Sequence, residues 1–137
     1  MKAGALALRL FIGAVLLATS AGKLLDVRGF AGVLKTYEAF PERVLLPLAF
    51  AIPLAELGLA VWLLSGRGLA GAALASAAMH AAYGAWSATS LLRGLELANC
   101  GCFGVFLARP LGWRTVVEDG VMVGLSLWLA VLARRPA

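Results

Sequence analysis

The stretch NCGCFG, residues 99–104, holds the only two cysteines of the chain, Cys100 and Cys102, with Gly101 between them. A disulfide between these cysteines would close a ring of three residues, for which chain entropy contributes only about 1.6 kcal/mol of stability. So short a ring is also hard to close without strain, although a glycine opens backbone angles that other residues avoid. A structural crosslink is therefore one interpretation of the pair, and a weak one, because a strained disulfide is easily reduced.

Metal binding is a second interpretation of the two thiols. A structural zinc site takes four ligands, whereas this chain offers two cysteines and a single histidine, His80. His80 falls near the middle of an apolar segment, about 18 Å along a helix from its outer end, so it cannot complete a zinc site in the cysteine loop. We predict no zinc site, while the soft ions copper(I) and mercury(II) remain open as ligands of two thiolates.

Thiol-disulfide exchange is the third interpretation, and it needs only the residues that are present. Two adjacent thiols can attack a partner disulfide, form a mixed disulfide and resolve it, moving two electrons. Arginines flank the loop, and a nearby positive charge lowers a thiol pKa, although the same arginines could anchor to lipid phosphates. We expect Cys100 and Cys102 to be catalytic. The supporting loop residues are Asn99, Gly101, Phe103, Gly104 and Trp113.

The rest of the sequence indicates that a membrane positions this loop. Hydrophobic residues make up 62% of the 137 residues and charged residues only 14%, and the mean hydropathy is +0.92. Soluble domains are about 25% charged, and a span needs about 20 apolar residues. We predict an all-α integral membrane protein, a single four-transmembrane-helix bundle over residues 1–137, in which the first apolar segment is kept as a helix. The spans are residues 3–22, 44–65, 69–92 and 115–133.

The connection between the first and second spans, residues 24–43, carries a helical pattern of its own. Its apolar residues recur at steps of three and four, which is typical of an amphipathic helix. Such a helix is expected to lie on the membrane surface and to end at the step from Phe40 to Pro41. We therefore predict an amphipathic surface helix between the first two spans.

The basic residues are scattered at the ends of the apolar segments. They give a net charge of +5 but form no continuous stripe, so nucleic acid is not expected as a partner and membrane lipid is. The short tails and the turn at Arg67 are uniformly basic, which favours cytoplasmic termini. We expect a multi-pass protein of the inner (plasma) membrane with its cysteine loop outside the cytoplasm.

Arg9, Glu56 and His80 are ionisable residues that fall deep inside the predicted spans. Such groups are costly in a bilayer and are candidates for function. Glu56 and His80 lie at similar depths, where they could relay protons or hydrogen-bond a quinone. The alternatives are structural, with Glu56 paired to Arg9 and His80 joining helices. We treat the three residues as a candidate proton or quinone site.

Several motifs together resemble a known family. SAGKLLDVRGFAGVLKTYEAFP (residues 20–41), PLAELGLAVWLL (53–64), and NCGCFG followed by PLGW (110–113) are similar to the MauE family of methylamine-utilisation membrane proteins, within the DoxX-like group. The resemblance implies a four-helix membrane protein that is associated with thiol and disulfide chemistry outside the cytoplasm and usually works with a thioredoxin-like partner. It also implies that Cys100 and Cys102 are redox-active. In the methylamine system such proteins are linked to maturation of a disulfide-rich dehydrogenase subunit.

The predicted function is thus that of a membrane thiol-disulfide oxidoreductase. Better-known membrane thiol oxidases carry two cysteine pairs, whereas this chain has one. Either the single pair also reduces a membrane quinone, or electrons pass between two proteins without a quinone. Two other functions stay open: a soft-metal (copper or mercury) binding membrane protein, and a non-catalytic subunit that docks a redox partner.

Overall fold

The computed structural model describes residues 2–135, and the regular structure within that range is entirely helical. This confirms the all-α prediction. Short connections join successive helices, except for the long segment that carries the cysteines. The helices are α1 (Ala3–Leu24), α2 (Val27–Thr36), α3 (Glu42–Ser65), α4 (Leu69–Leu92) and α5 (Trp113–Arg134).

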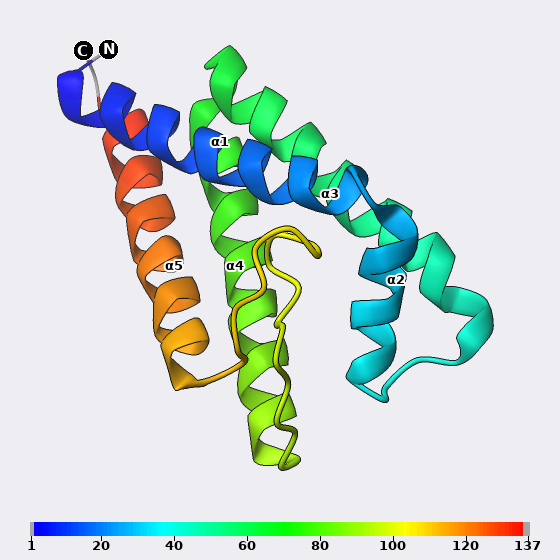
Figure 1. Cartoon of the computed structure of the whole chain (residues 1–137). Coiled ribbons are helices and arrows are strands. Elements are labelled where there is room, and N and C mark those ends of the chain that lie inside the picture. Colours follow the sequence, from blue (N-terminus) through cyan, green and yellow to red (C-terminus); the bar gives the residue numbers. More distant parts are fainter. Residues whose placement is uncertain (1, 136–137) are drawn as a thin grey trace.

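The long helices form two antiparallel pairs (Figure 1). α1 packs mainly along α3, and α4 packs mainly along α5. The start of α1 and the end of α5 lie together at one end of the molecule, whereas the connection from α4 to α5 leaves and re-enters at the other end. The short helix α2 packs against α3 with Phe30, Val33 and Leu34 buried.

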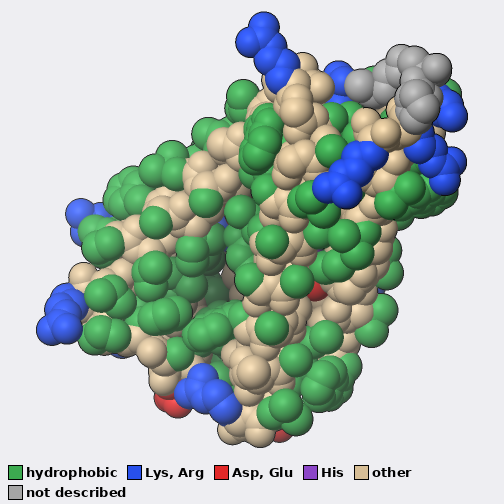
Figure 2. Space-filling view, turned by 180° about the vertical axis from the view of Figure 1, so that it is seen from behind, with side chains coloured by type: hydrophobic (Ala, Val, Ile, Leu, Met, Phe, Trp, Pro, Cys, Tyr) green, Lys and Arg blue, Asp and Glu red, His purple; other side chains and the backbone are tan. Residues whose placement is uncertain are grey.

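Among the described residues, three helices, α1, α3 and α5, are long and apolar enough to cross a membrane. Hydrophobic side chains cover most of the face in Figure 2, and Lys and Arg side chains lie toward its edges. These features describe a membrane protein. α4 is as long as α3, with 24 residues each, but is not one of these three helices. The fourth span and the placement of α2 on a membrane surface therefore stay predictions.

The contact between α4 and α5 is built from small side chains. Ala72, Ala73 and Ser76 of α4 are fully buried, and small residues allow helix backbones to approach closely in a bilayer. Ser76 Oγ lies 2.8 Å from Ser126 Oγ of α5 and makes a hydrogen bond across the pair. The two helices are thus held by close packing and by a buried polar contact.

Candidate functional site

The cysteine loop, residues 93–112, folds back into the bundle and runs beside α4 toward α1 (Figure 1). Two backbone hydrogen bonds hold its outgoing and returning arms together. The Cys100 N–H donates to the Arg109 carbonyl at 2.7 Å, and the Leu111 N–H donates to the Leu97 carbonyl at 3.0 Å. The Tyr37 hydroxyl, at the end of α2, donates to the Cys100 carbonyl at 2.5 Å. The loop therefore has a defined conformation that places the thiols inside the protein.

A tight turn at the tip of the loop presents the cysteines. Asn99 closes it at both sides: its Oδ1 accepts from the Gly101 N–H at 2.9 Å, and its Nδ2 donates to the Gly104 carbonyl at 3.0 Å. Gly101 and Gly104 have φ angles of +83° and +69°, in the left-handed region that favours glycine. The two glycines and Asn99 thus fix the direction of the thiols.

The loop tip is seated on the last turn of α1 through backbone contact. A Cβ atom added at Gly104 would lie 2.3 Å from the Gly22 carbonyl oxygen, and one added at Gly22 would lie 2.3 Å from the Phe103 carbonyl oxygen. No side chain fits between two backbones at this distance. The pairing of Gly22 with Gly104 is therefore what lets the loop reach into the bundle.

The two thiols face each other. Their sulfur atoms are 2.7 Å apart, and both cysteines are free. Cys100 is only 8% exposed, whereas Cys102 is half-buried. The hydrogen bond from Cys102 lowers the pKa of the Cys100 thiol to about 6, with smaller contributions from the Cys102 backbone N–H and the Arg109 guanidinium. The pKa of Cys102, the donor of that bond, is raised. The pair therefore holds one thiolate and one thiol near neutral pH.

Arg109 is the arginine of the loop that acts on the thiols. Its guanidinium bonds Glu118 of α5 at 2.5 Å, and this bond raises the pKa of Arg109. Arg93 instead donates to the backbone carbonyls of Tyr37 and Glu38, at 2.8 and 3.2 Å. Of the flanking arginines, Arg109 supports the thiolate and Arg93 fastens the end of α2.

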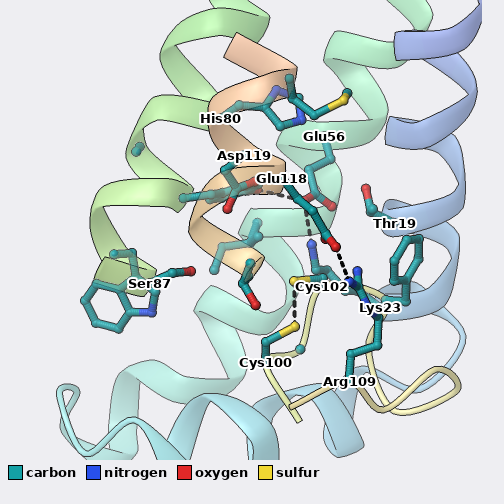
Figure 3. Close-up of a pocket in the computed structure, with 18 of the residues that line it drawn as sticks. Thr19, Lys23, Glu56, His80, Ser87, Cys100, Cys102, Arg109, Glu118 and Asp119 are labelled. Atoms are coloured by element: carbon teal, nitrogen blue, oxygen red, sulfur yellow. Dashed lines mark hydrogen bonds and ion pairs between the residues drawn. The ribbon is translucent and has the colours of Figure 1, made fainter. Parts of the chain in front are cut away.

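Both thiols line a cavity of about 380 Å³ that also reaches Glu56 and His80. Figure 3 shows these four residues around one space, with Lys23 among them. From the sequence, the cysteines and the intramembrane groups are predicted to form two separate sites. The structure places them at a single cavity.

Lys23 is the partner of Glu56. Its Nζ lies 2.5 Å from Glu56 Oε1, and both side chains are almost fully buried. The Tyr83 hydroxyl donates to the same oxygen at 2.7 Å. A Cβ atom added at Gly66 would lie 2.7 Å from Arg9 Nη1, which places the Arg9 guanidinium at the far end of α3. The pairing of Glu56 with Arg9 offered from the sequence is therefore replaced by the pairing with Lys23.

His80 is held within its own helix. Its Nδ1 donates to the Ser76 carbonyl at 2.9 Å, and Ser76 in turn bonds Ser126. His80 thereby joins the contact between α4 and α5 while its ring lines the cavity. Within residues 2–135 no group of three or more His, Cys, Asp or Glu side chains is arranged to hold a metal ion.

The two aromatic residues predicted to support the cysteine loop differ in their relation to the cavity. Phe103 lines the cavity, whereas Trp113 begins α5, is 56% exposed and is not part of the lining. The sequence pattern does not predict Lys23, Tyr37 and Tyr83 as site residues. Lys23 directly follows the apolar segment of the first predicted span. A lysine at this position, at the end of a helix, is the signal that could have identified it as a site residue.

The fold and site together define a helical membrane protein that holds a dithiol on an inward-folded loop against a cavity. The sequence model of the family described as methylamine utilisation protein MauE matches residues 1–132. The chain belongs to this family, as the sequence motifs indicate.

Curated relatives agree with the family match. The protein named methylamine utilization protein MauE of Paracoccus denitrificans is 32% identical over 124 residues, covering 90% of this chain and 67% of that protein. The protein of the same name from Paracoccus versutus is 33% identical over 132 residues, covering 95% and 71%. The one from Methylophilus methylotrophus is 30% identical over 128 residues, covering 90% and 65%. No solved structure matches the chain.

Proposed function

We propose that this chain is a membrane thiol-disulfide oxidoreductase that exchanges a disulfide between Cys100 and Cys102 and a thioredoxin-like protein outside the cytoplasm. The observation that carries the proposal is the asymmetry of the pair. The sulfurs face each other 2.7 Å apart, Cys102 is the more exposed, and Cys100 is the better stabilised as a thiolate. Exchange needs an accessible sulfur to attack and a low-pKa sulfur to leave. The names of the relatives extend the proposal to a role in methylamine utilisation.

The proposed reaction oxidises the partner. A partner thiolate attacks Cys102 of the disulfide form, a bond forms between these sulfurs, and Cys100 leaves as a thiolate. The second thiol of the partner then attacks the sulfur of the partner's first cysteine in the mixed disulfide and releases Cys102. The partner gains a disulfide and loses two electrons and two protons. This chain takes up both electrons and one proton, at Cys102, and the other proton passes to solvent.

The arrangement of the helices supports an extracytoplasmic loop. The start of α1 and the end of α5 share one end of the molecule, and the loop enters from the opposite end (Figure 1). Basic residues near short tails favour the cytoplasmic side of a plasma membrane. The proposed topology therefore has cytoplasmic termini, four spans and the dithiol facing outward.

Mixed-disulfide trapping tests the exchange and the roles of the two thiols. The bait is a thioredoxin-like protein of the same organism that lacks its resolving cysteine. We expect Cys100→Ser to form a covalent adduct through Cys102, and Cys102→Ser to form none, because Cys100 is buried. An adduct through Cys100 alone would reverse the roles of the two thiols, and no adduct with either variant would contradict the exchange.

The two other functions named from the sequence predict different results. A soft-metal binder would bind copper(I) tightly at one ion per chain and show no exchange with the bait. A docking subunit would bind the partner equally well after Cys100→Ser and Cys102→Ser are combined, and the oxidation state of the partner in cells would not change. We expect the combined variant to leave the partner reduced.

A further inference from the structure

The cavity beside the thiols contains an unsatisfied polar atom. Glu56 is fully buried, and its Oε2 has no hydrogen-bond partner among the described residues 2–135. A buried charged oxygen without a donor is costly, and such groups in folded proteins usually have a partner. Glu56 lines the cavity, so a ligand with a hydrogen-bond donor could satisfy Oε2 there.

A donor lies beside this acceptor. The Lys23 ammonium has three hydrogens, of which one is directed to Glu56 Oε1. It lies 5.5 Å from the ring centres of both Phe30 and Tyr83, which also line the cavity. The Lys23–Glu56 pair therefore offers one donor and one acceptor to the cavity without net charge. This arrangement suits the polar end of a neutral molecule better than an ion.

The remainder of the cavity suits a flat, apolar body. Aromatic side chains form much of its lining, and the rings of Phe40 and Trp86 stack with their centres 5.3 Å apart. A volume of about 380 Å³ is in the range of small-molecule sites. Cys100 and Cys102 line the same cavity. The ligand would therefore lie against the groups that give or take electrons.

From these contacts we propose that the cavity binds a quinone, with one ring carbonyl at the Lys23–Glu56 pair. A quinone is neutral, flat and apolar, and it accepts the two electrons that a dithiol releases. The inference rests on the proposed function and names the second substrate of the same site. In this site, Lys23 and Tyr83 take the place of Arg9, which is part of the site predicted from the sequence.

The pair fits both states of this ligand. A quinone carbonyl accepts a hydrogen bond from the Lys23 ammonium, and a hydroquinone hydroxyl donates one to Glu56 Oε2. In the step itself, the S–H bond of Cys102 breaks and a disulfide forms between Cys102 and the Cys100 thiolate. The two electrons and the Cys102 proton pass to the quinone, the second proton comes from solvent, and the two carbonyl oxygens of the quinone become hydroxyls. The dithiol is oxidised, and the quinone is reduced.

Binding can be tested without the redox reaction. The full chain carrying Cys100→Ser and Cys102→Ser is placed in nanodiscs and titrated with menadione, while the fluorescence of Trp86 reports occupancy of the cavity. A parallel Trp86→Phe titration identifies the signal of that residue. We expect saturable quenching that disappears with Trp86→Phe. Quenching that does not saturate, or that is the same without Trp86, would overturn the proposed site.

Two variants locate the ligand within the cavity. Glu56→Gln removes the charged acceptor of the hydroquinone hydroxyl and should weaken the binding of menadiol, titrated without oxygen, about tenfold, in line with the loss of one hydrogen bond to a charged group. Ala82→Phe fills the cavity from an exposed position of its lining and should weaken binding at least as much without removing a buried charge. The matched control is Lys35→Gln in the exposed pair of Lys35 with Glu42, which should leave binding unchanged. Equal affinity of Ala82→Phe and the parent would contradict the site.

A single-turnover measurement tests the electron transfer. The fully reduced chain is mixed with menadione without oxygen, and the remaining thiols are counted by maleimide mass. We expect two thiols to be lost for each menadiol formed, and thiols that stay reduced would overturn the step. If partner trapping fails while menadione binds and oxidises the dithiol, the quinone site stands and the proposed partner exchange falls. If partner trapping succeeds while menadione neither binds nor oxidises the dithiol, the partner exchange stands and only the quinone site is overturned.

Discussion

Lys23 of α1 and Glu56 of α3 form a buried ion pair, with Nζ and Oε1 2.5 Å apart. The pair joins two helices that are separated by α2 in the chain, and it does so at the cavity that holds the thiols. The ammonium and the carboxylate both lie where water is excluded, so each charge is stabilised mainly by the other.

Removing one charge of this pair should destabilise the protein strongly. We expect Lys23→Met to lower the free energy of unfolding by about 3–5 kcal/mol, because it leaves the Glu56 charge buried and unpaired. Adding Glu56→Leu to it should restore much of the loss. The measurement is denaturant or thermal unfolding in nanodiscs. The control Lys35→Met breaks an exposed pair and should cost less than about 1 kcal/mol. Equal losses for the two lysines would contradict the burial of the pair.

A side chain at Gly104 should displace the loop. Gly104→Ala adds a Cβ atom 2.3 Å from the Gly22 carbonyl oxygen at a residue with φ of +69°, and the backbone conformation alone costs about 1–2 kcal/mol. We expect maleimide to label Cys102 several times faster than in the parent. Gly124→Ala in α5, where nothing lies within 4 Å of the added atom, is the matched control and should leave labelling unchanged.

The reactivity of the dithiol should follow the pKa of Cys100, which is about 6. The thiolate is the reactive form, and its fraction rises with pH through this value. We expect the ultraviolet thiolate absorbance of the reduced protein to have its midpoint near pH 6, and to fall about tenfold for each unit of pH well below it. Cys102→Ser removes the free thiol that donates to Cys100. It should move the midpoint upward, since the hydrogen bond between the thiols is the largest cause of the lowering.

Arg109→Gln should raise the same midpoint by a smaller amount. The guanidinium acts on Cys100 through its charge, and this effect ranks below the hydrogen bond from Cys102. Arg114→Gln is the control, because Arg114 bonds Glu118 at 3.2 Å from an exposed position. A midpoint that moves equally with both variants would show that the net charge of the loop, and not the place of Arg109, sets the pKa.

The Tyr37 hydroxyl should contribute to holding the loop in place. Tyr37→Phe removes the hydrogen bond to the Cys100 carbonyl and keeps the ring that lies 5.5 Å from the ring of Trp86. We expect a loss of about 1–3 kcal/mol in the free energy of unfolding, because a buried carbonyl loses its donor. Faster hydrogen exchange of the Cys100 amide would locate the effect in the loop. Unchanged exchange and stability would show that the aromatic packing alone holds the loop.

The helices could be predicted from the sequence because their signals are local. The third predicted segment, residues 69–92, coincides with α4, and the others differ from α1, α3 and α5 by at most two residues at either end. Apolar length is enough to define such segments. It does not show how many of them span the membrane, since Ala, Ser and Gly make α4 suitable for close packing as much as for contact with lipid.

The candidate site could be predicted only in part, because its contacts are not local. The cysteines and the glycine between them are adjacent in the chain, so their chemistry can be read from their spacing. Lys23 and Glu56 are 33 positions apart, and only the crossing of α1 and α3 brings them together. Arg9 lies on the same helix as Lys23 but several turns away, and hydropathy does not distinguish which of the two basic residues reaches Glu56.

Gly22 and Lys23 are neighbours on the last turn of α1, and each serves a different part of the site. Gly22 receives the tip of the cysteine loop, and Lys23 carries the charge that faces Glu56. A small rotation of this single turn would shift the loop and the ammonium in concert. Binding of a partner protein at the cysteine loop would then also change the cavity, because both are attached to the same helical turn.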